Sequence, residues 1–336
     1  IGRDMLAAVE VHRFELPGIR VDVRPRRNYL VERSATHALG YLGEISEDEL
    51  KAETCEDCRG GDYIGKTGLE RSLEGEMRGK RGGRQVEVNA AGQVVRVLKT
   101  VDAQPGNNIF LTIDADLQAI AEAHLVGKAG AVVAVDPTSG EVLCMASSPT
   151  FDQNIFITGV SHEAWQELSG DPYRPFENKA VQAEYPPAST YKIITAIAGL
   201  EEGIIDENTT FDCPGQLRFG NRTFRCWRRA GHGTEDVNNA LAESCDVFFY
   251  QVGLKLGVDR LAWHAKACGL GAHTGIKLDR EKAGLIPTAA WKKRRFGIPW
   301  QQGETLSVAI GQGYNLVTPL QMAVLSAAVA NGGTRY

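Results

Sequence analysis

Tyr185-Pro186-Pro187-Ala188-Ser189-Thr190-Tyr191-Lys192 is the most informative stretch of this chain, because a serine is followed three residues later by a lysine. If the segment from Ser189 is helical, its hydroxyl and the amine of Lys192 share one face about one turn apart. A partly desolvated lysine beside a serine can take the serine's proton and so create a nucleophile without a histidine. The alternative interpretation is a serine that caps a helix beside a solvated lysine.

The residues before Ser189 favour the start of a helix. Pro186 and Pro187 stand just upstream of it, and proline suits the first turn of a helix because its missing N–H costs nothing there. We therefore expect a helix over residues 189–200 with Ser189 at or near its N-terminus. Free backbone N–H groups and the positive end of the helix dipole can stabilise an alkoxide and a nearby oxyanion at that place.

A second candidate motif, Ser244-Cys245-Asp246, supplies a hydroxyl and a carboxylate two residues apart. In a bent loop both side chains can face one cleft. Ser244 is then a candidate proton relay between Lys192 and a leaving group, and Asp246 is a candidate for orienting the site.

Bulk properties restrict the class of protein. The chain has 336 residues, which suggests about two domains. Its 43% hydrophobic and 24% charged residues are typical of a folded protein. A net charge of −5 argues against nucleic acid or an acidic membrane surface as the main partner. No apolar run approaches the roughly 18 residues that a membrane-spanning helix needs.

A boundary is expected near residues 105–108, Pro-Gly-Asn-Asn, between a unit of residues 1–105 and a unit of residues 106–336. The first unit is rich in Arg, Glu and Gly. Its strand-like pieces are residues 18–23 and 93–98, and its Gly-rich and charged stretches, expected to be mobile surface loops, are residues 55–65 and 79–84.

The second unit combines a β-hairpin with several helices. Residues 130–135 and 141–147 are typical of strands, and the Asp-Pro-Thr-Ser-Gly between them is turn chemistry. A further strand is expected at residues 109–113. Helices clustered with an antiparallel sheet indicate an α+β fold. The helical patterns occupy residues 116–125, 189–200, 237–256, 259–268 and 319–331.

Several stretches together resemble the class B penicillin-binding transpeptidases, whose superfamily carries S-x-x-K, S-D-N and K-T-G motifs. The resemblance runs through most of residues 16–336. Within the class it is most similar to the elongation enzymes, because Asp246 stands where the division enzymes typically have Asn and residues 63–70 match the N-terminal region. The other carriers are the two serine motifs and residues 130–137, 145–149, 310–314 and 318–319.

The resemblance implies a serine D,D-transpeptidase that crosslinks peptidoglycan stem peptides and is acylated by β-lactams. In this family's reaction Ser189 would attack the D-Ala-D-Ala carbonyl, and an amine of a neighbouring strand would resolve the acyl-enzyme. Lys192 would act as the base and Ser244 as the proton shuttle. Asp246 would orient the site and contact the substrate or Lys192. This chemistry requires no cofactor.

The resemblance also implies a transpeptidase fold similar to β-lactamases, on an N-terminal, mostly β pedestal of the dimerisation type with a mobile head loop. The pedestal would dock a RodA-type, lipid-linked glycan polymerase of the elongation complex. The enzyme would act on stem peptides and lipid-linked precursor at the periplasmic face of the cytoplasmic membrane, anchored by an N-terminal helix outside this chain. His37 with Gly40-Tyr41 matches a pedestal motif and is expected to be structural.

Lys66-Thr67-Gly68 spells the family's third motif but precedes Ser189 by more than a hundred residues, so we assign it to the pedestal. In the family, that motif lies on a strand after both serine motifs, where it supplies an oxyanion-hole N–H and a cation for the substrate carboxylate. Such a strand would follow residues 331–336, so we expect this sequence to be a piece of a longer enzyme. Losing one oxyanion donor typically costs about 10²–10³ in rate.

Cys213, Cys226, His232 and Cys245 form a C-x12-C-x5-H-x12-C pattern between the two serine motifs. Three thiolates and an imidazole are a common tetrahedral zinc set, and four protein ligands make a structural site. A zinc ion there would hold the loop of Ser244 from behind. The alternatives are a Cys213–Cys226 disulfide with Cys245 buried and free, or unrelated buried thiols.

Other candidate residues receive structural interpretations. Cys55 and Cys58 form a C-x2-C pair with no second pair nearby, which favours a local disulfide or a labile loop over a metal site. Trp227 and Trp263 are expected to pack in the core rather than to line a cleft.

Two rival functions stay open on the sequence. A carboxypeptidase or a class D-like β-lactamase would keep the serine chemistry and transfer the acyl group to water, although a β-lactamase needs no long N-terminal region. A non-catalytic scaffold would use its pedestal to activate a partner polymerase, and the absence of a third motif after the serine motifs is its support.

Overall fold

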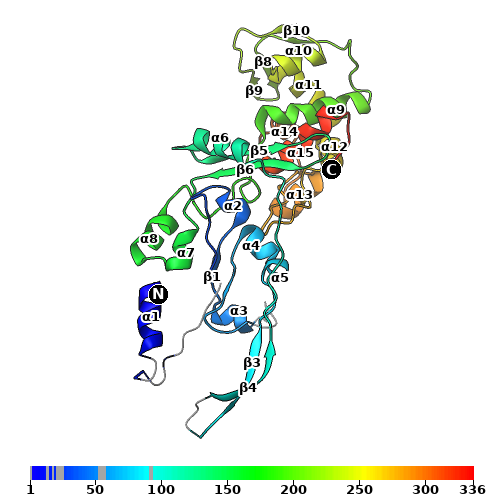
Figure 1. Ribbon diagram of the computed structural model, residues 1–336. Helices are drawn as coiled ribbons and strands as arrows, with labels where there is room; N and C mark the ends of the chain where they lie inside the picture. Colours follow the sequence, from blue (N-terminus) through cyan, green and yellow to red (C-terminus); the bar gives the residue numbers. More distant parts are fainter. Residues whose placement is uncertain (1, 13–14, 17–18, 20–25, 52–57, 91–93) are drawn as a thin grey trace.

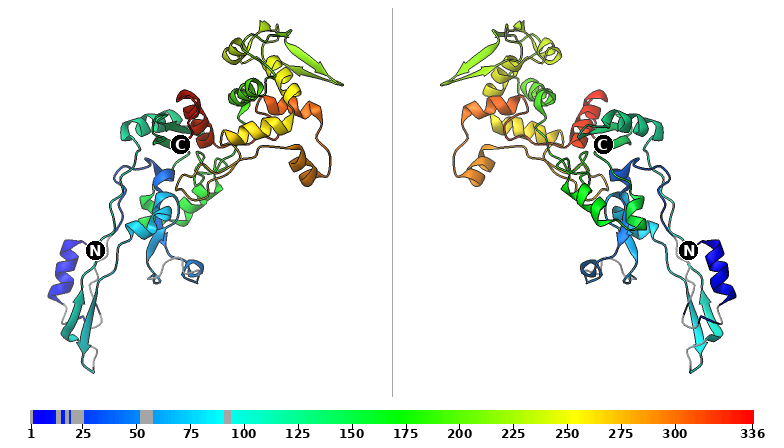
Figure 2. Two further views of the ribbon diagram at one scale, coloured as in Figure 1. Left: turned by 90° about the vertical axis from the view of Figure 1, so that its right-hand side faces the viewer. Right: turned by 90° about the vertical axis from the view of Figure 1, so that its left-hand side faces the viewer.

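A computed structural model describes every residue except 1, 13–14, 17–18, 20–25, 52–57 and 91–93. The strand expected at residues 18–23 therefore lies almost entirely outside the described residues, and so does Cys55. Figures 1 and 2 show an elongated molecule, with residues 3–11 and 83–88 toward one end, residues 211–242 toward the other and the C-terminus near the middle.

Short helices and two antiparallel strand pairs build the N-terminal region (Figure 1). β1 pairs with β2, and β3 pairs with β4. Helices thus share the expected pedestal with its strands. These elements are α1 (Arg3–Val11), α2 (Thr36–Leu39), β1 (Leu42–Glu44), α3 (Glu47–Lys51), β2 (Tyr63–Gly65), α4 (Gly68–Ser72), α5 (Glu74–Met77), β3 (Gly83–Val88) and β4 (Val94–Val101).

β3 and β4 form an antiparallel pair that projects from the body, and every residue of the two strands is exposed (Figure 1). The strand expected at residues 93–98 is confirmed as β4. The loops expected at residues 55–65 and 79–84 are wrong in part, because β2 lies in the first and β3 begins in the second. Gly65 approaches the backbone of Glu70 so closely that no side chain would fit. The glycine that suggested a loop instead permits a close contact between β2 and α4.

The expected β-hairpin of the second unit is confirmed as β5 (Gly130–Val135) and β6 (Val142–Ser148), which pair antiparallel. The helix before it, α6 (Ala115–Leu125), packs against β6 and begins at its cap Asp114. The strand expected at residues 109–113 is wrong. The Thr112 hydroxyl and the N–H of Asp114, which follows the segment, donate hydrogen bonds to the β6 carbonyls of Val142 and Leu143. These two bonds do not make a regular strand ladder.

Helices make up most of the rest of the second unit, and the mostly buried α11 packs against α9, α12 and α14. The helices expected at residues 259–268 and 319–331 are confirmed as α12 and α15. The elements are α7 (Asn154–Thr158), α8 (His162–Gly170), η1 (Ala188–Tyr191), α9 (Lys192–Glu201), α10 (Val237–Ala242), α11 (Asp246–Leu256), α12 (Val258–Ala267), α13 (Ala289–Phe296), α14 (Gln302–Ala309) and α15 (Pro319–Ala330).

The helix expected over residues 237–256 is wrong at its middle, where α10 ends and α11 begins. Ser244 adopts a left-handed φ of 54°, which a continuous right-handed helix excludes. The Cys245 N–H closes α10 by donating to the Ala240 carbonyl at 2.8 Å. The amine of Lys192 donates to the carbonyl of Ser244 at 2.8 Å, so a tertiary contact helps to hold the break.

Two short antiparallel strand pairs stand at the far end of the molecule, beside α10 and α11 (Figure 1). β7 (Phe211–Cys213) pairs with β10 (Gly233–Glu235), and β8 (Gln216–Phe219) pairs with β9 (Arg222–Arg225). Cys213 ends β7, Cys226 directly follows β9 and His232 directly precedes β10, so these strands position three of the candidate metal ligands. Across the described part of the chain, every helix is too short or too polar to cross a lipid bilayer.

The junction between the two units is polar and close-packed. His37 lies in α2, is buried, and its Nε2 is 2.5 Å from the Pro175 carbonyl. Burial lowers the pKa of His37 to about 4, so this imidazole is neutral near pH 7 and donates to the carbonyl. The Gly68 N–H donates to Asp279 Oδ1 at 2.6 Å. His37 thus has the structural place expected of it.

Candidate active site

Ser189 lies in a short 3-10 turn, η1, which leads directly into α9. The helix expected over residues 189–200 is therefore found with its first turn tightened. Ala188 has a left-handed φ of 50° and donates its N–H to the Gly311 carbonyl at 2.9 Å. Gly311 in turn packs so closely on Ala188 and Tyr191 that no Cβ would fit. The loop after α14 thus holds the turn that presents an exposed Ser189.

Lys192 is the buried centre of the site, with 1% of its surface exposed. Its Nζ donates to Ser244 Oγ at 3.0 Å, to the Ser244 carbonyl at 2.8 Å and to Asp246 Oδ1 at 2.6 Å. The structure thus brings both residues of the second motif onto the lysine of the first.

Asp246 is the first residue of α11 and has both carboxylate oxygens occupied. Oδ1 accepts from Lys192, and Oδ2 accepts from the Trp227 N–H at 3.0 Å. A buried charge is tolerated when it is paired and its remaining lone pairs are satisfied. Asp246 therefore neutralises Lys192 and ties it to the segment that follows Cys226.

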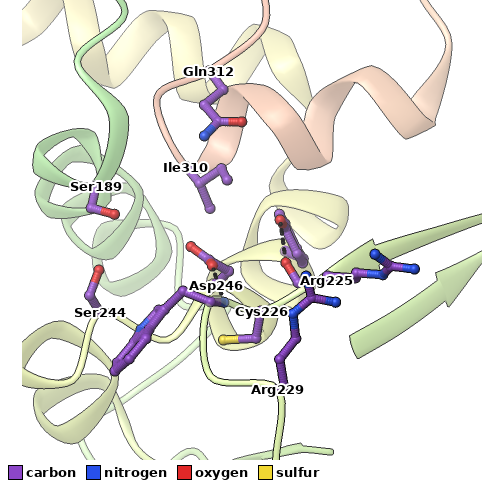
Figure 3. A pocket seen from close by; sticks show the side chains of 10 residues that line it. Ser189, Arg225, Cys226, Arg229, Ser244, Asp246, Ile310 and Gln312 are labelled. Carbon is purple, nitrogen blue, oxygen red and sulfur yellow. Dashed lines mark hydrogen bonds between the residues drawn. The ribbon is translucent and has the colours of Figure 1, made fainter. Parts of the chain in front are cut away.

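Ser189 Oγ forms no hydrogen bond with any described residue. Figure 3 shows the hydroxyls of Ser189 and Ser244 directed into the same space. Because Ser244 Oγ also contacts Lys192, it stands where a hydroxyl could pass a proton between the lysine and a group bound at Ser189.

A cavity of about 570 Å³ opens in front of these groups. Tyr250 lies in its wall, and burial raises the pKa of this phenol, so its hydroxyl stays protonated and donates to the Arg225 carbonyl at 3.2 Å. The residues that line the cavity are Ser189, Arg225, Cys226, Trp227, Arg229, Ser244, Asp246, Tyr250, Ile310 and Gln312.

The sequence interpretation missed part of this lining. Trp227 is 63% exposed and lines the cavity, and Trp263 is 65% exposed, so the expectation that both pack in the core is wrong. Arg225 and Arg229 were not singled out. Residues 225–229, Arg-Cys-Trp-Arg-Arg, resemble an ordinary charged surface in the sequence, and Arg225 and Arg229 line a cavity with Ser189 only once β9 has folded back.

Cys213, Cys226, His232 and Cys245 come together behind the second motif, with one candidate ligand atom from each within 4.8 Å of the others. His232 Nδ1 is 3.5 Å from the sulfurs of both Cys213 and Cys226. All three cysteines are buried free thiols, so the structure does not contain the alternative Cys213–Cys226 disulfide. Burial raises the pKa of Cys245, and a bound metal would replace its proton.

The surroundings of His232 also fit a metal ligand. Its Nε2 is buried without a hydrogen bond and lies 3.7 Å from Glu243 Oε2, the kind of carboxylate that orients a ligating imidazole. Gly215 and Gly231 have positive φ, and their backbones cross too closely for any side chain. The residues present therefore fit a tetrahedral, closed zinc site.

Two sequence motifs lie outside this site. Lys66 in Lys66-Thr67-Gly68 pairs with Glu49 at 2.5 Å, and Gly68 contacts Asp279. This tripeptide lies in the N-terminal unit, to which the sequence assigned it, and contacts the second unit at the junction. Cys58 is disulfide-bonded, whereas Cys55 lies outside the described residues.

Comparison with known proteins agrees with this geometry. The family model for the penicillin binding protein transpeptidase domain matches residues 130–336, and the model for the penicillin-binding protein dimerisation domain matches residues 1–111. This chain is a penicillin-binding protein. The family and the α+β fold predicted from the motifs are confirmed.

Relatives of this penicillin-binding protein include the peptidoglycan D,D-transpeptidase MrdA of Escherichia coli K12, 40% identical over 98% of this chain and 53% of the relative. The MrdA of Haemophilus influenzae is 41% identical over 98% of this chain and 52% of the relative. The chain thus spans about half the length of the curated relatives it matches.

Solved structures resemble this penicillin-binding protein over nearly its whole length. A complex between penicillin-binding protein PBP2 and MreC from Helicobacter pylori has a TM-score of 0.91, with 34% identity over 99% of this chain and 62% of that one. A peptidoglycan synthase complex that coordinates polymerization and crosslinking has a TM-score of 0.82, with 38% identity over 99% of this chain and 60% of that one.

Proposed function

We propose that this chain carries the serine machinery of a peptidoglycan D,D-transpeptidase, which crosslinks stem peptides that end in D-Ala-D-Ala. The observation that carries the proposal is the hydrogen-bonded set of Lys192, Ser244 and Asp246 beside an exposed Ser189. The similarity to enzymes named peptidoglycan D,D-transpeptidases supports it.

In the first half-reaction, Lys192 Nζ gives its excess proton to Asp246 Oδ1, 2.6 Å away, and then takes the proton of Ser189 as Ser189 Oγ forms a bond to the carbonyl carbon of the penultimate D-Ala. Ser244 Oγ, 3.0 Å from Nζ, relays a proton to the amide nitrogen of the terminal D-Ala. The C–N bond then breaks, and D-Ala leaves with a neutral amine. The peptide remains as an ester on Ser189.

In the second half-reaction, an amine of a neighbouring stem peptide attacks the ester carbonyl. Its proton returns through Ser244 and Lys192 to Ser189 Oγ, and the C–O bond breaks. A new amide forms, and the enzyme recovers its starting protonation. Asp246 keeps Lys192 in position throughout, through the 2.6 Å contact. A β-lactam would acylate Ser189 by the first half-reaction because its ring amide imitates the peptide.

We propose a structural zinc ion held by Cys213, Cys226, His232 and Cys245. Four protein ligands would leave no open position for catalysis, so the ion would supply only folding energy and rigidity. Two of its ligands adjoin the site directly, since Cys245 precedes Asp246 and Cys226 precedes Trp227. The transpeptidase chemistry itself uses none of these four side chains.

The surroundings of the enzyme follow from its family. We propose residues 1–105 as the pedestal and residues 106–336 as the transpeptidase unit. The pedestal would dock a RodA-type glycan polymerase and other elongation proteins at the periplasmic face of the cytoplasmic membrane. Similarity to a PBP2–MreC complex and to a peptidoglycan synthase complex supports such partners. The net charge of −5 argues against nucleic acid as a partner.

Release of D-alanine tests this function. Full-length protein given a D-Ala-D-Ala pentapeptide and an amine acceptor should release D-alanine and form crosslinked peptide in equal amounts, and Ser189→Ala should abolish both. Release of D-alanine without crosslinking would support a hydrolase instead. No release and no labelling by penicillin would support a non-catalytic scaffold.

A further inference from the structure

Two arginines line the same cavity as the nucleophile. Arg225 is the last residue of β9, and Arg229 lies in the loop between Cys226 and His232. Figure 3 shows both side chains on the side of the cavity away from Ser189. The cavity thus has a hydroxyl nucleophile at one side and two guanidinium groups at the other.

Neither guanidinium has a counter-charge in the part of the chain that the structure describes. By contrast, Arg228 between them pairs with Glu243 at 3.0 Å. Asp246 is the one acidic residue in the cavity lining, and both of its oxygens are already used by Lys192 and the Trp227 N–H. Two positively charged residues in the wall of a cavity without an available acid attract an anion from outside.

The backbone that carries the arginines is fixed before any ligand arrives. The Tyr250 hydroxyl donates to the Arg225 carbonyl at 3.2 Å. At the Arg229 loop, the Cys226 N–H donates to the Gly215 carbonyl at 2.9 Å, and the His232 N–H donates to the Cys213 carbonyl at 3.0 Å. A fixed backbone reduces the entropy lost when a guanidinium binds a ligand.

We propose that Arg225 and Arg229 form a carboxylate-binding subsite for the donor peptide. The ligand is a carboxylate on the side chain of the residue that directly precedes the residue whose carbonyl Ser189 attacks. One extended residue spans about 3.3–3.6 Å, so such a side chain stays within the same cavity. Guanidinium groups suit a carboxylate because they can bind it through two parallel hydrogen bonds. This inference rests on the proposed transpeptidase function.

The subsite would make the enzyme prefer donors with a free side-chain carboxylate over donors with a carboxamide there. Charge-assisted hydrogen bonds of this kind give a preference of about tenfold to a hundredfold. The terminal carboxylate of the leaving D-Ala is the same in both donors, so the comparison isolates the side-chain group.

The test measures kcat/KM for D-alanine release by the full-length protein with each of two pentapeptide donors, one carrying the carboxylate and the other the carboxamide. No acceptor amine is added, so the value reports acylation alone and excludes recognition of the acceptor strand. We expect the native protein to favour the carboxylate donor at least tenfold. The double variant Arg225→Gln/Arg229→Gln should bring the ratio of the two values to within about twofold of one.

Two further variants control for charge and strand stability. Arg222→Gln removes the same charge from the same strand, where the guanidinium lies over the Phe224 ring outside the cavity lining, and should keep the native ratio. Arg225→Lys/Arg229→Lys keeps the charge without the planar fork and should retain part of the preference. Each result is a ratio within one protein, so partial loss of folded protein does not change it.

The outcomes separate this inference from the proposed function. A native protein that releases D-alanine equally fast from both donors overturns the subsite and leaves the transpeptidase intact. A preference that survives the double Gln variant also overturns it. A native protein that neither releases D-alanine nor labels at Ser189 with fluorescent penicillin overturns the proposed function itself.

Discussion

Removal of the Asp246 carboxylate tests the buried ion pair at the centre of the site. In Asp246→Ala, Lys192 would stay 1% exposed with only the two Ser244 oxygens as partners. The Trp227 N–H would lose its acceptor as well. An uncompensated buried charge typically costs about 3–5 kcal/mol, and a buried donor left unpaired costs about 1 kcal/mol or more. We expect the free energy of unfolding to fall by about 4 kcal/mol.

A double-mutant cycle with Lys192→Met isolates the pair. Replacing both charged groups leaves no unpaired charge. The loss of unfolding free energy in the double variant should therefore be smaller than the sum of the two single losses by at least about 2 kcal/mol. The exposed pair of Glu87 and Arg96 provides a matched control, for which Glu87→Ala should cost less than about 1 kcal/mol.

Urea unfolding followed by tryptophan fluorescence measures these free energies, provided that the m-value stays constant. A cost below about 1 kcal/mol for Asp246→Ala, or additivity within about 0.5 kcal/mol in the cycle, would refute the account of a buried and mutually dependent pair.

Three further predictions concern the supports of the site. His37 has a folded pKa of about 4 against about 6.5 unfolded, so the unfolded chain binds the extra proton. Its stabilisation is complete above about pH 6.5 and is lost as the pH falls toward 4, by about 2 kcal/mol at pH 5. Urea unfolding at about pH 6.5 and about pH 5 should show this loss of stability, and His37→Gln should remove it. Zinc analysis of the native protein should find about one ion per chain. A chelator should lower the thermal unfolding midpoint of the native protein but not that of Cys226→Ser. A native protein without zinc contradicts the proposed site. Gly311→Ala places a Cβ 2.6 Å from that of Tyr191 at a φ of +70°, so it should lower the free energy of unfolding by about 1–3 kcal/mol. It should also slow the acylation of Ser189 by penicillin. An unchanged acylation rate would show that this loop does not position Ser189.

Local sequence signals predicted the elements whose structure depends on local chemistry. The hairpin of β5 and β6 follows from apolar runs on either side of an Asp-Pro-Thr-Ser-Gly turn. α15 follows from Thr318, Pro319 and Gln321, which supply a capping box and a proline in the first turn. The candidate metal ligands could be grouped in advance because cysteine and histidine are few and chemically distinctive.

Features that depend on tertiary contacts were not visible in the pattern. Residues 237–256 have continuous helical periodicity, and the break at Ser244 is held by the amine of Lys192, 52 positions earlier in the chain. The arginines of the cavity gave no signal of their own, because residues 225–229 read as an ordinary charged surface. Only the folding of β8 and β9 against α11 brings them into the wall of the cavity that Ser189 also lines.

The most direct test of the central claim is the mass of the full-length protein after exposure to a β-lactam. The native protein should gain one β-lactam mass, and peptide mapping should place it on Ser189. Ser189→Ala should gain none, whereas Thr190→Ala, which changes the next hydroxyl in the same turn, should still be acylated. Acylation that persists in Ser189→Ala, or a native protein that gains no mass, would contradict the assignment of Ser189 as the nucleophile.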